Sequence, residues 1–225
     1  MEAAAKPRVK ICCIADTREA WTAIRFGASA LGLVSYMPSG PGVISERMIS
    51  EIADVVPPGI SSFLLTSERD AAAIVAQVRR TRVNTVQICD RLEKGTYGDL
   101  RAALPGISIV QVVHVTGEHA VAETISIARN VDAILLDSGN RSLPVKELGG
   151  TGRTHDWNIS RKIREMLDIP VFLAGGLAAD NIQAAIRKVG PFGVDVCSGV
   201  RTDGKLDETK LAAFFRHITE HATLT

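Results

Sequence analysis

The chain has 225 residues, 46% of them hydrophobic and 4% aromatic, and its 26 Lys and Arg against 25 Asp and Glu leave a net charge of +1. A near-neutral chain without basic blocks interleaved with aromatics does not fit a nucleic acid or an anionic membrane as partner. The length suits one domain, 1–225, with a core from about residue 9 to about residue 220.

No uninterrupted apolar run approaches the roughly 20 residues of a membrane span, and Met1–Pro7 lacks the apolar stretch of a signal peptide. Of the four cysteines, Cys12 and Cys13 are adjacent, while Cys89 and Cys197 are distant. This spacing gives neither a disulfide framework nor a C-x-x-C metal clip. We therefore expect a cytoplasmic protein with reduced thiols and no bound metal.

Short apolar runs rich in β-branched residues alternate with stretches of helical apolar spacing along the chain. The apolar runs predict strands at Val9–Cys12, Ala30–Val34, Ser61–Thr66, Thr85–Cys89, Ser108–Val113, Ala133–Asp137, Val171–Ala174 and Val194–Cys197. The stretches between them predict helices at Glu19–Phe26, Arg47–Val55, Ala71–Val78 and Ala120–Ala128. The charged segment Arg201–Lys210 predicts an exposed turn and a helix start, with Asp207 as N-cap.

Continuous apolar strands separated by helices are typical of parallel strands buried on both faces, which indicates an α/β protein. An open doubly wound sheet is the alternative. The count of eight strands and the glycine-rich ends of the last two favour a single-domain (β/α)8 TIM barrel. The longest strand-to-helix connection is Ser138–Asp156, and long loops at this face of a barrel often carry function.

Two glycine-rich junctions, within Phe172–Leu177 and Gly193–Val200, stand out near the end of the chain. In each, an apolar strand runs into glycines and then into a predicted helix. Such junctions point unpaired backbone N–H groups at one place, and barrels bind phosphate after their seventh and eighth strands. The predicted phosphate-binding residues are Gly175, Gly176, Ser198 and Gly199.

The remaining chemistry is expected where the strands end. Cys12 and Asp137 follow strongly apolar strands that would desolvate them, so they form a candidate acid–base pair. Alternatively, Cys12 is a small buried hydrophobe and Asp137 caps a loop. A soft metal site that joins the thiols to Asp137 or His114 is disfavoured, since the first and fourth strands lie on opposite sides of a barrel.

Several motifs together match one family. They are Lys10-Ile11-Cys12, Leu135-Leu136-Asp137, Gly149-Gly150-Thr151-Gly152 with Asp156-Trp157, Leu173-Ala174-Gly175-Gly176-Leu177, and Val194-Asp195-Val196 through Ser198-Gly199-Val200. With these, the chain resembles phosphoribosylanthranilate isomerase, the TrpF family of tryptophan biosynthesis, from about Val9 to Phe215.

The resemblance implies an Amadori rearrangement of a small phosphorylated sugar-amine without cofactor or metal. In the family's pattern the general base falls on Cys12 and the general acid on Asp137. A free thiol titrates near 8.5, and a carboxyl group that acts as an acid at neutral pH needs a raised pKa. Asp195 falls on a position expected to bind the sugar hydroxyls, and Gly150 and Arg153 are further substrate-binding candidates.

The chain departs from the family at the end of the site expected to bind the anthranilate. The arginine expected to bind the anthranilate carboxylate falls on Pro41 or Gly42, the glycine after the catalytic cysteine is Cys13, and a glutamate is replaced by Arg201. Arg153 or Arg201 are candidates for the missing cation.

Two alternatives therefore stay open beside the anthranilate reaction. One is a related phosphoribosylamine whose aglycone lacks the carboxylate. The other is a non-catalytic barrel that binds a phosphometabolite, which the intact pair Cys12 and Asp137 disfavours. For the assembly we expect a monomer or a homodimer.

Overall fold

The computed structural model describes residues 6–223, and the side chains of residues 6–220; the first five and last two residues of the predicted domain lie outside the described residues. Eight parallel strands form a closed barrel in sequence order, with β1 beside β8. The strands are β1 (Arg8–Ile11), β2 (Ala30–Val34), β3 (Ser61–Thr66), β4 (Thr85–Ile88), β5 (Ser108–His114), β6 (Ala133–Asp137), β7 (Val171–Leu173) and β8 (Gly193–Val196). The predicted (β/α)8 barrel is confirmed.

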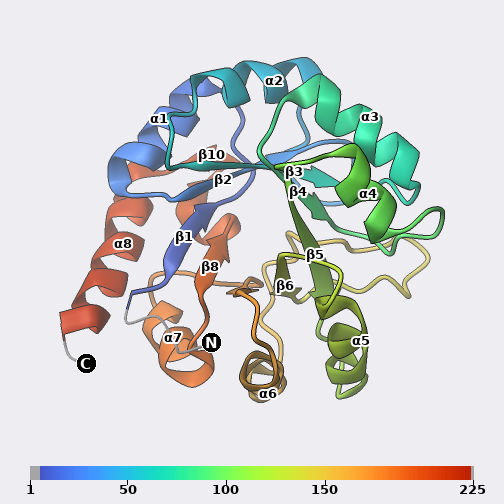
Figure 1. Ribbon diagram of the computed structural model, residues 1–225. Coiled ribbons are helices and arrows are strands. Elements are labelled where there is room, and N and C mark those ends of the chain that lie inside the picture. The colour runs from blue at the N-terminus through green and yellow to red at the C-terminus, as the bar shows by residue number, and fades with distance from the viewer. Residues whose placement is uncertain (1–5, 224–225) are drawn as a thin grey trace.

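Helices surround the strands on the outside of the barrel (Figure 1). They are α1 (Thr17–Phe26), α2 (Glu46–Val55), α3 (Ala71–Thr81), α4 (Tyr97–Ala103), α5 (His119–Ala128), α6 (Trp157–Met166), α7 (Ile182–Val189) and α8 (Glu208–Thr223). Local chemistry sets their ends. For example, the Asp16 side chain caps α1 by accepting from the Glu19 N–H at 2.8 Å, and Gly27 ends it at φ +109°.

The predicted strands differ from the observed ones by at most one residue at each end. Cys12, predicted as a strand residue, lies just past the end of β1, although its N–H still donates to Val196 O at 2.8 Å. Asp207 is confirmed as a cap, because its Oδ1 accepts from the Thr209 N–H at 2.9 Å. The exposed turn is confirmed at residues 202–205, but the side chain of Arg201, where the segment begins, is buried.

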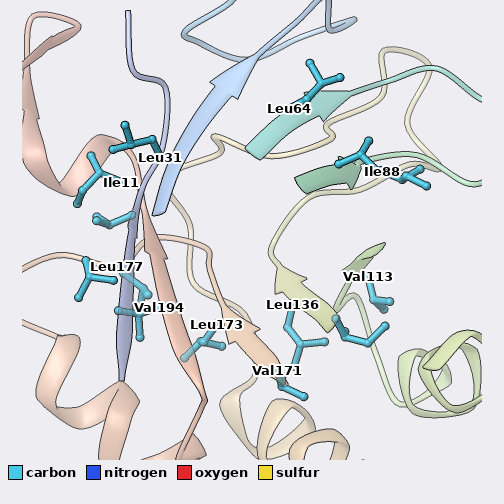
Figure 2. Close-up of a cluster of buried hydrophobic side chains, with 14 of the residues drawn as sticks. Ile11, Leu31, Leu64, Ile88, Val113, Leu136, Val171, Leu173, Leu177 and Val194 are labelled. Carbon is cyan, nitrogen blue, oxygen red and sulfur yellow. The ribbon is translucent and has the colours of Figure 1, made fainter. Parts of the chain in front are cut away.

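Side chains of the strands alternate between two cores. The outer core lies between strands and helices and is aliphatic, with Leu31, Leu64 and Val194 all fully buried (Figure 2). The inner core fills the barrel and mixes apolar side chains such as Phe63 and Phe172 with buried polar ones. The barrel interior therefore supplies both packing and chemistry.

No helix in the described residues is long and apolar enough to cross a membrane.

Candidate active site

One pocket at the carboxyl ends of the strands collects most of the predicted site residues. Cys12 and Asp137 both line it, from opposite parts of the chain. The other predicted residues that line it are Gly150, Gly175, Gly176, Asp195 and Ser198. Gly199 and Arg153 do not line it.

Cys12 is buried at the base of the β1–α1 loop. The next residue, Cys13, has φ +63°, a left-handed conformation that costs a residue with a Cβ roughly 1–2 kcal/mol. Its Sγ lies 2.8 Å from Cys197 Sγ, just past β8. Hydrogen bonds with Cys12 and Cys197, together with burial, raise the pKa of Cys13, and the hydrogen bond between Cys13 and Cys197 lowers the pKa of Cys197.

Asp137 is the last residue of β6, and its side chain is 8% exposed. Burial raises the pKa of Asp137 to about 6, and the charge of Asp195 adds to this effect, while hydrogen bonds from Ser138 oppose it. The Ser138 N–H donates to Asp137 Oδ1 at 2.7 Å. A Cβ on Gly149 would lie 2.9 Å from Asp137 Oδ2, so a glycine is needed where this loop approaches the carboxyl group. A carboxyl with such a pKa can donate a proton near neutral pH.

A buried ion pair lies in the barrel interior, and of its two residues Asp195 lines the pocket. Lys10 Nζ on β1 lies 2.9 Å from Asp195 Oδ1 on β8, and the two residues are register partners. Burial lowers the pKa of Lys10, but the Asp195 carboxylate, together with Cys12 and Cys89, more than reverses this and leaves the pKa above its ordinary value. Lys10 is therefore charged, and the pair fixes the Asp195 carboxylate inside the barrel.

The glycine-rich junctions after β7 and β8 lie side by side at the pocket, as predicted, but the elements that follow differ from the prediction. After Gly175 and Gly176, both at positive φ, helix α7 begins only at Ile182. After β8 the chain forms a single 3-10 turn, Ser198–Val200, and a two-stranded hairpin before α8. A Cβ on Gly199 would lie 2.0 Å from Leu177 O, so glycine there permits the two junctions to pack together.

The opposite wall is formed by two loops that contact each other. Ser39 Oγ donates to Lys146 O at 2.6 Å, and a Cβ on Gly150 would lie 2.5 Å from Pro41 Cδ. Of the two positions that match the family's arginine, Pro41 lines the pocket, whereas a Cβ on Gly42 would lie 2.5 Å from Cys13 Cβ. Within the described residues, no lysine or arginine lines this pocket.

The two arginines considered as replacements have other partners. Arg153 is half exposed and forms an ion pair with Glu147. Arg201 pairs with Glu19 at 3.0 Å, behind the β1–α1 loop.

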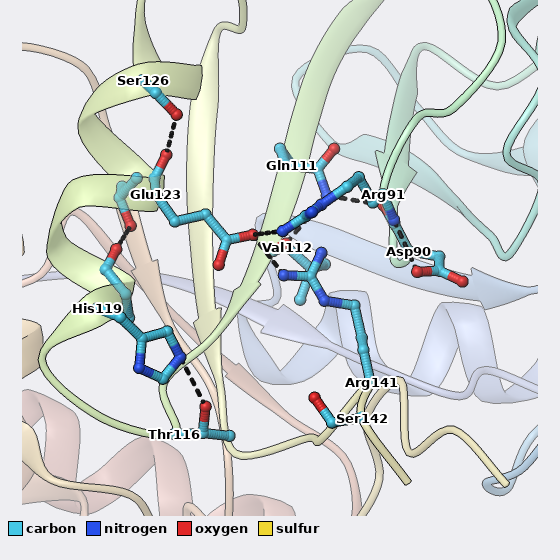
Figure 3. Close-up of polar contacts among 12 residues, drawn as sticks. Asp90, Arg91, Gln111, Val112, Thr116, His119, Glu123, Ser126, Arg141 and Ser142 are labelled. Carbon is cyan, nitrogen blue, oxygen red and sulfur yellow. Dashed lines mark hydrogen bonds and ion pairs between the residues drawn. The ribbon is translucent and has the colours of Figure 1, made fainter. Parts of the chain in front are cut away.

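A second, charged pocket lies over the ends of β4, β5 and β6. In it, Glu123 accepts from both Arg91 and Arg141 (Figure 3). His114, another residue at a strand end, lines this second pocket instead of the first, and burial lowers its pKa to about 4. It is therefore neutral at pH 7 and separate from Cys12. In the part of the chain with described side chains, no cluster of three or more His, Cys, Asp or Glu is placed to hold a metal ion.

The fold and the site define a class: a (β/α)8 barrel with a buried thiol and a raised-pKa carboxyl facing glycine-rich strand ends in one pocket. Residues 9–217 match the family model of N-(5'-phosphoribosyl)anthranilate isomerase. The chain belongs to this family of isomerases.

Individual relatives agree. The chain is 36% identical over 209 residues to N-(5'-phosphoribosyl)anthranilate isomerase 2 of Methanosarcina mazei, covering 92% of each chain. It is similar to the phosphoribosyl anthranilate isomerase structure from Thermotoga maritima, with a TM-score of 0.79, 27% identity, and coverage of 95% of this chain and 99% of that one. A phosphoribosyl anthranilate isomerase in complex with reduced 1-(o-carboxyphenylamino)-1-deoxyribulose 5-phosphate gives a TM-score of 0.77 at 26% identity, with the same coverage.

Sequence reasoning missed several residues of the site. The lysine inside the first apolar strand was a detectable signal, because Lys10 interrupts a strand predicted to be buried on both faces. The contact between Cys13 and Cys197 joins residues 184 positions apart, and no local pattern indicates it.

Proposed function

We propose that this chain catalyses the Amadori rearrangement of N-(5'-phosphoribosyl)anthranilate to the 1-deoxyribulose 5-phosphate product. The observation that carries the proposal is the meeting of Cys12 and Asp137 in one pocket whose edge is formed by the glycine-rich ends of β7 and β8. A general acid and a general base facing one cavity suit an isomerisation that needs one proton given and one removed.

In the proposed mechanism, Asp137 acts first. Its raised pKa, about 6, leaves part of the carboxyl protonated near neutral pH. It donates this proton to the ring oxygen of the ribosylamine, the C–O bond breaks, and a Schiff base forms. The Cys12 thiolate then removes the proton from C2, and the resulting enamine tautomerises to the aminoketone. Transfer of these protons in the pocket needs neither metal nor cofactor.

The phosphate is proposed to bind to backbone N–H groups of Gly175, Gly176, Ser198 and Gly199. Support comes from the adjacent positions of the two junctions and from the absence of room for side chains at Gly176 and Gly199. Asp195, which lines the pocket, is proposed to accept hydrogen bonds from the sugar hydroxyls. Gly150, in the loop above, is a further proposed contact, whereas Arg153, the other candidate, does not line the pocket and pairs with Glu147. A monomer or homodimer in the cytoplasm stays a prediction.

One observation favours a second candidate substrate. Because no lysine or arginine in the described residues lines the pocket, the aglycone end lacks the cation that a carboxylate usually binds. A phosphoribosylamine with an uncharged aromatic aglycone would fit the same acid, base and phosphate site.

The test is the loss of anthranilate fluorescence with phosphoribosylanthranilate generated in situ, with Cys12→Ala as the inactive control. We expect turnover in the wild type and a loss of at least about 100-fold in the variant. Wild-type turnover that Cys12→Ala leaves intact would contradict the assigned base. The aniline analogue separates the substrates: equal KM values for the two would indicate that the carboxylate is not recognised.

A further inference from the structure

The backbone that carries Cys12 is strained and needs an external restraint. Cys13, the next residue, has φ +63°, and its side chain is confined between Cys197 Sγ at 2.8 Å and the chain at Gly42. A residue with a Cβ keeps this conformation only where its surroundings enforce it.

The enforcing group is a buried guanidinium. Arg201 Nη2 donates to Cys12 O at 3.2 Å and to Cys13 O. These two carbonyl groups flank the strained residue and belong to the peptide units that determine its conformation. The same guanidinium reaches Gly204 O through Nη1 at 2.9 Å, so it connects the β1–α1 loop to the hairpin that follows β8.

Glu19 holds the guanidinium in this orientation. Its carboxylate accepts from Arg201 Nη1 at 3.1 Å and from Nη2 at 3.0 Å, a bidentate pair, and both side chains are largely buried. It also accepts from the N–H of Ala15 at 3.0 Å and of Leu206 at 2.9 Å. Although burial raises the pKa of Glu19, these hydrogen bonds lower it below its ordinary value, so the pair stays charged.

We propose that Arg201 is a positioning residue: held by Glu19, it restrains the Cys12–Cys13 backbone in its strained conformation and so points the catalytic thiol into the pocket. This inference rests on the proposed function of Cys12. Arg201 itself does not line the pocket and makes no contact with the reacting atoms. Its place directly after the 3-10 turn at Ser198–Val200 also couples the β1–α1 loop to the phosphate end of the site.

The test exploits the difference between a restraint and a contact. Arg201→Met removes the donors and keeps much of the side-chain volume. We expect kcat to fall about tenfold to 100-fold, because a displacement of about 1 Å at the reacting group has effects of that size. KM should change less than about threefold, since the phosphate junctions keep their glycines.

Relief of the strain should rescue the variant. Cys13→Gly removes the Cβ that opposes positive φ, so the β1–α1 loop can keep this conformation without the restraint from Arg201. In the Cys13→Gly background, Arg201→Met should lower kcat by less than about threefold. Cys13→Ala is the matched control, because it removes the same sulfur and keeps the Cβ, and it should not rescue.

The melting temperature gives a reading that needs no substrate. Cys13→Gly should raise the melting temperature, and Cys13→Ala should not. The rise with glycine should be larger when Arg201 is present, because Arg201 is the group that maintains the strain. If Arg201→Met does not fold, Arg201→Lys replaces it. The lysine ammonium keeps a positive charge beside Glu19 but cannot bridge the carbonyls of Cys12 and Cys13. We therefore expect kcat to fall in Arg201→Lys and to be restored by Cys13→Gly.

Three results would overturn the proposal: an equal kcat loss from Arg201→Met in all three backgrounds at position 13, a change in KM alone, or no difference in melting temperature between the glycine and alanine variants. A wild-type enzyme that shows no turnover would refute the proposed function, and the melting temperatures would then decide on the restraint separately.

Discussion

The two halves of the pocket are built in different ways. On the β7–β8 side, two short strands end in glycines whose backbones pack directly on each other, as at Gly199 against Leu177. On the other side, the loop after β2 and the long loop after β6 contact through Ser39 and Lys146 and through Pro41 and Gly150. The first half is fixed by backbone and leaves no room for side chains. The second is built from contacts between two loops, and none of the described lysine or arginine side chains lines the pocket there.

This difference teaches which part of the site is free to change. A phosphate and two proton transfers need fixed geometry, which close backbone packing provides. An aglycone needs only a matching surface, and loops accept new residues at small energetic cost. We therefore expect variants at the acid–base pair and in the first half to affect the reaction, and variants in the second half to affect substrate preference.

The largest effect is expected from Asp137→Asn, which removes the proposed acid. Because an amide cannot donate the proton that opens the ring, kcat should fall by about 100-fold to 10,000-fold, with little change in KM. Steady-state kinetics measure this. A loss confined to KM would mean that Asp137 binds the substrate without acting as the acid.

The same substitution should stabilise the fold. The pKa of Asp137, about 6 in the folded state, lies above its ordinary value of 3.8, so the folded state holds the proton more tightly than the unfolded chain. Ionisation of the buried Asp137 therefore destabilises the folded state. The resulting loss of unfolding free energy is absent below about pH 4, grows as the pH rises, and reaches about 3 kcal/mol above pH 6. Denaturant unfolding should give Asp137→Asn a higher unfolding free energy than the wild type at pH 8, and the difference should disappear at pH 4.

Asp180→Asn, at an exposed position, controls for the loss of one negative charge. An equal gain from the two variants at pH 8 would contradict the burial penalty.

A smaller effect is expected at the phosphate junctions. A Cβ on Gly176 would lie 2.7 Å from the Arg153 carbonyl carbon, so Gly176→Ala should displace this backbone and raise KM by roughly tenfold. Gly106→Ala is a matched control, because Gly106 also has positive φ and nothing lies within 4 Å of its Cβ position. If both variants raise KM equally, the effect comes from backbone strain and not from the phosphate site.

Pro41→Arg tests the loop half. It would place a guanidinium at the pocket and should lower KM for the anthranilate substrate about threefold to tenfold, without changing KM for the aniline analogue. Pro41→Gln controls for the loss of proline. Gly42→Arg should instead destabilise the protein, since its Cβ would meet Cys13. An equal change for both substrates would show that the guanidinium does not reach the carboxylate.

The smallest effect is expected from Arg153→Met. A direct contact with the substrate carboxylate would cost roughly tenfold in KM, whereas loss of the exposed pair with Glu147 alone would change KM less than about threefold. The exposure of Arg153 favours the smaller value. Glu147→Gln frees Arg153 from its ion pair and should also change KM less than about threefold. A clear fall in KM would show that the freed Arg153 can bind the substrate carboxylate.

How far the sequence predicts this molecule depends on the range of the interactions involved. Strand positions, and the location of Cys12 and Asp137 at strand ends, follow from short apolar runs and the residues that end them, as at β6 and Asp137. The conformation of Cys13 does not, because it depends on Arg201, which lies 188 residues further on. Arg201 also shows the limit of local composition: a charged segment predicts exposure, and a buried glutamate from another helix reverses it.

The Lys10–Asp195 pair lies at the seam where the first strand meets the last. During synthesis, Lys10 is added to the chain 185 residues before its counter-ion, Asp195. Burying the ammonium without that partner is strongly unfavourable. Burial of Lys10 on β1 therefore depends on the presence of β8, so the barrel can close only after the eighth strand has been made.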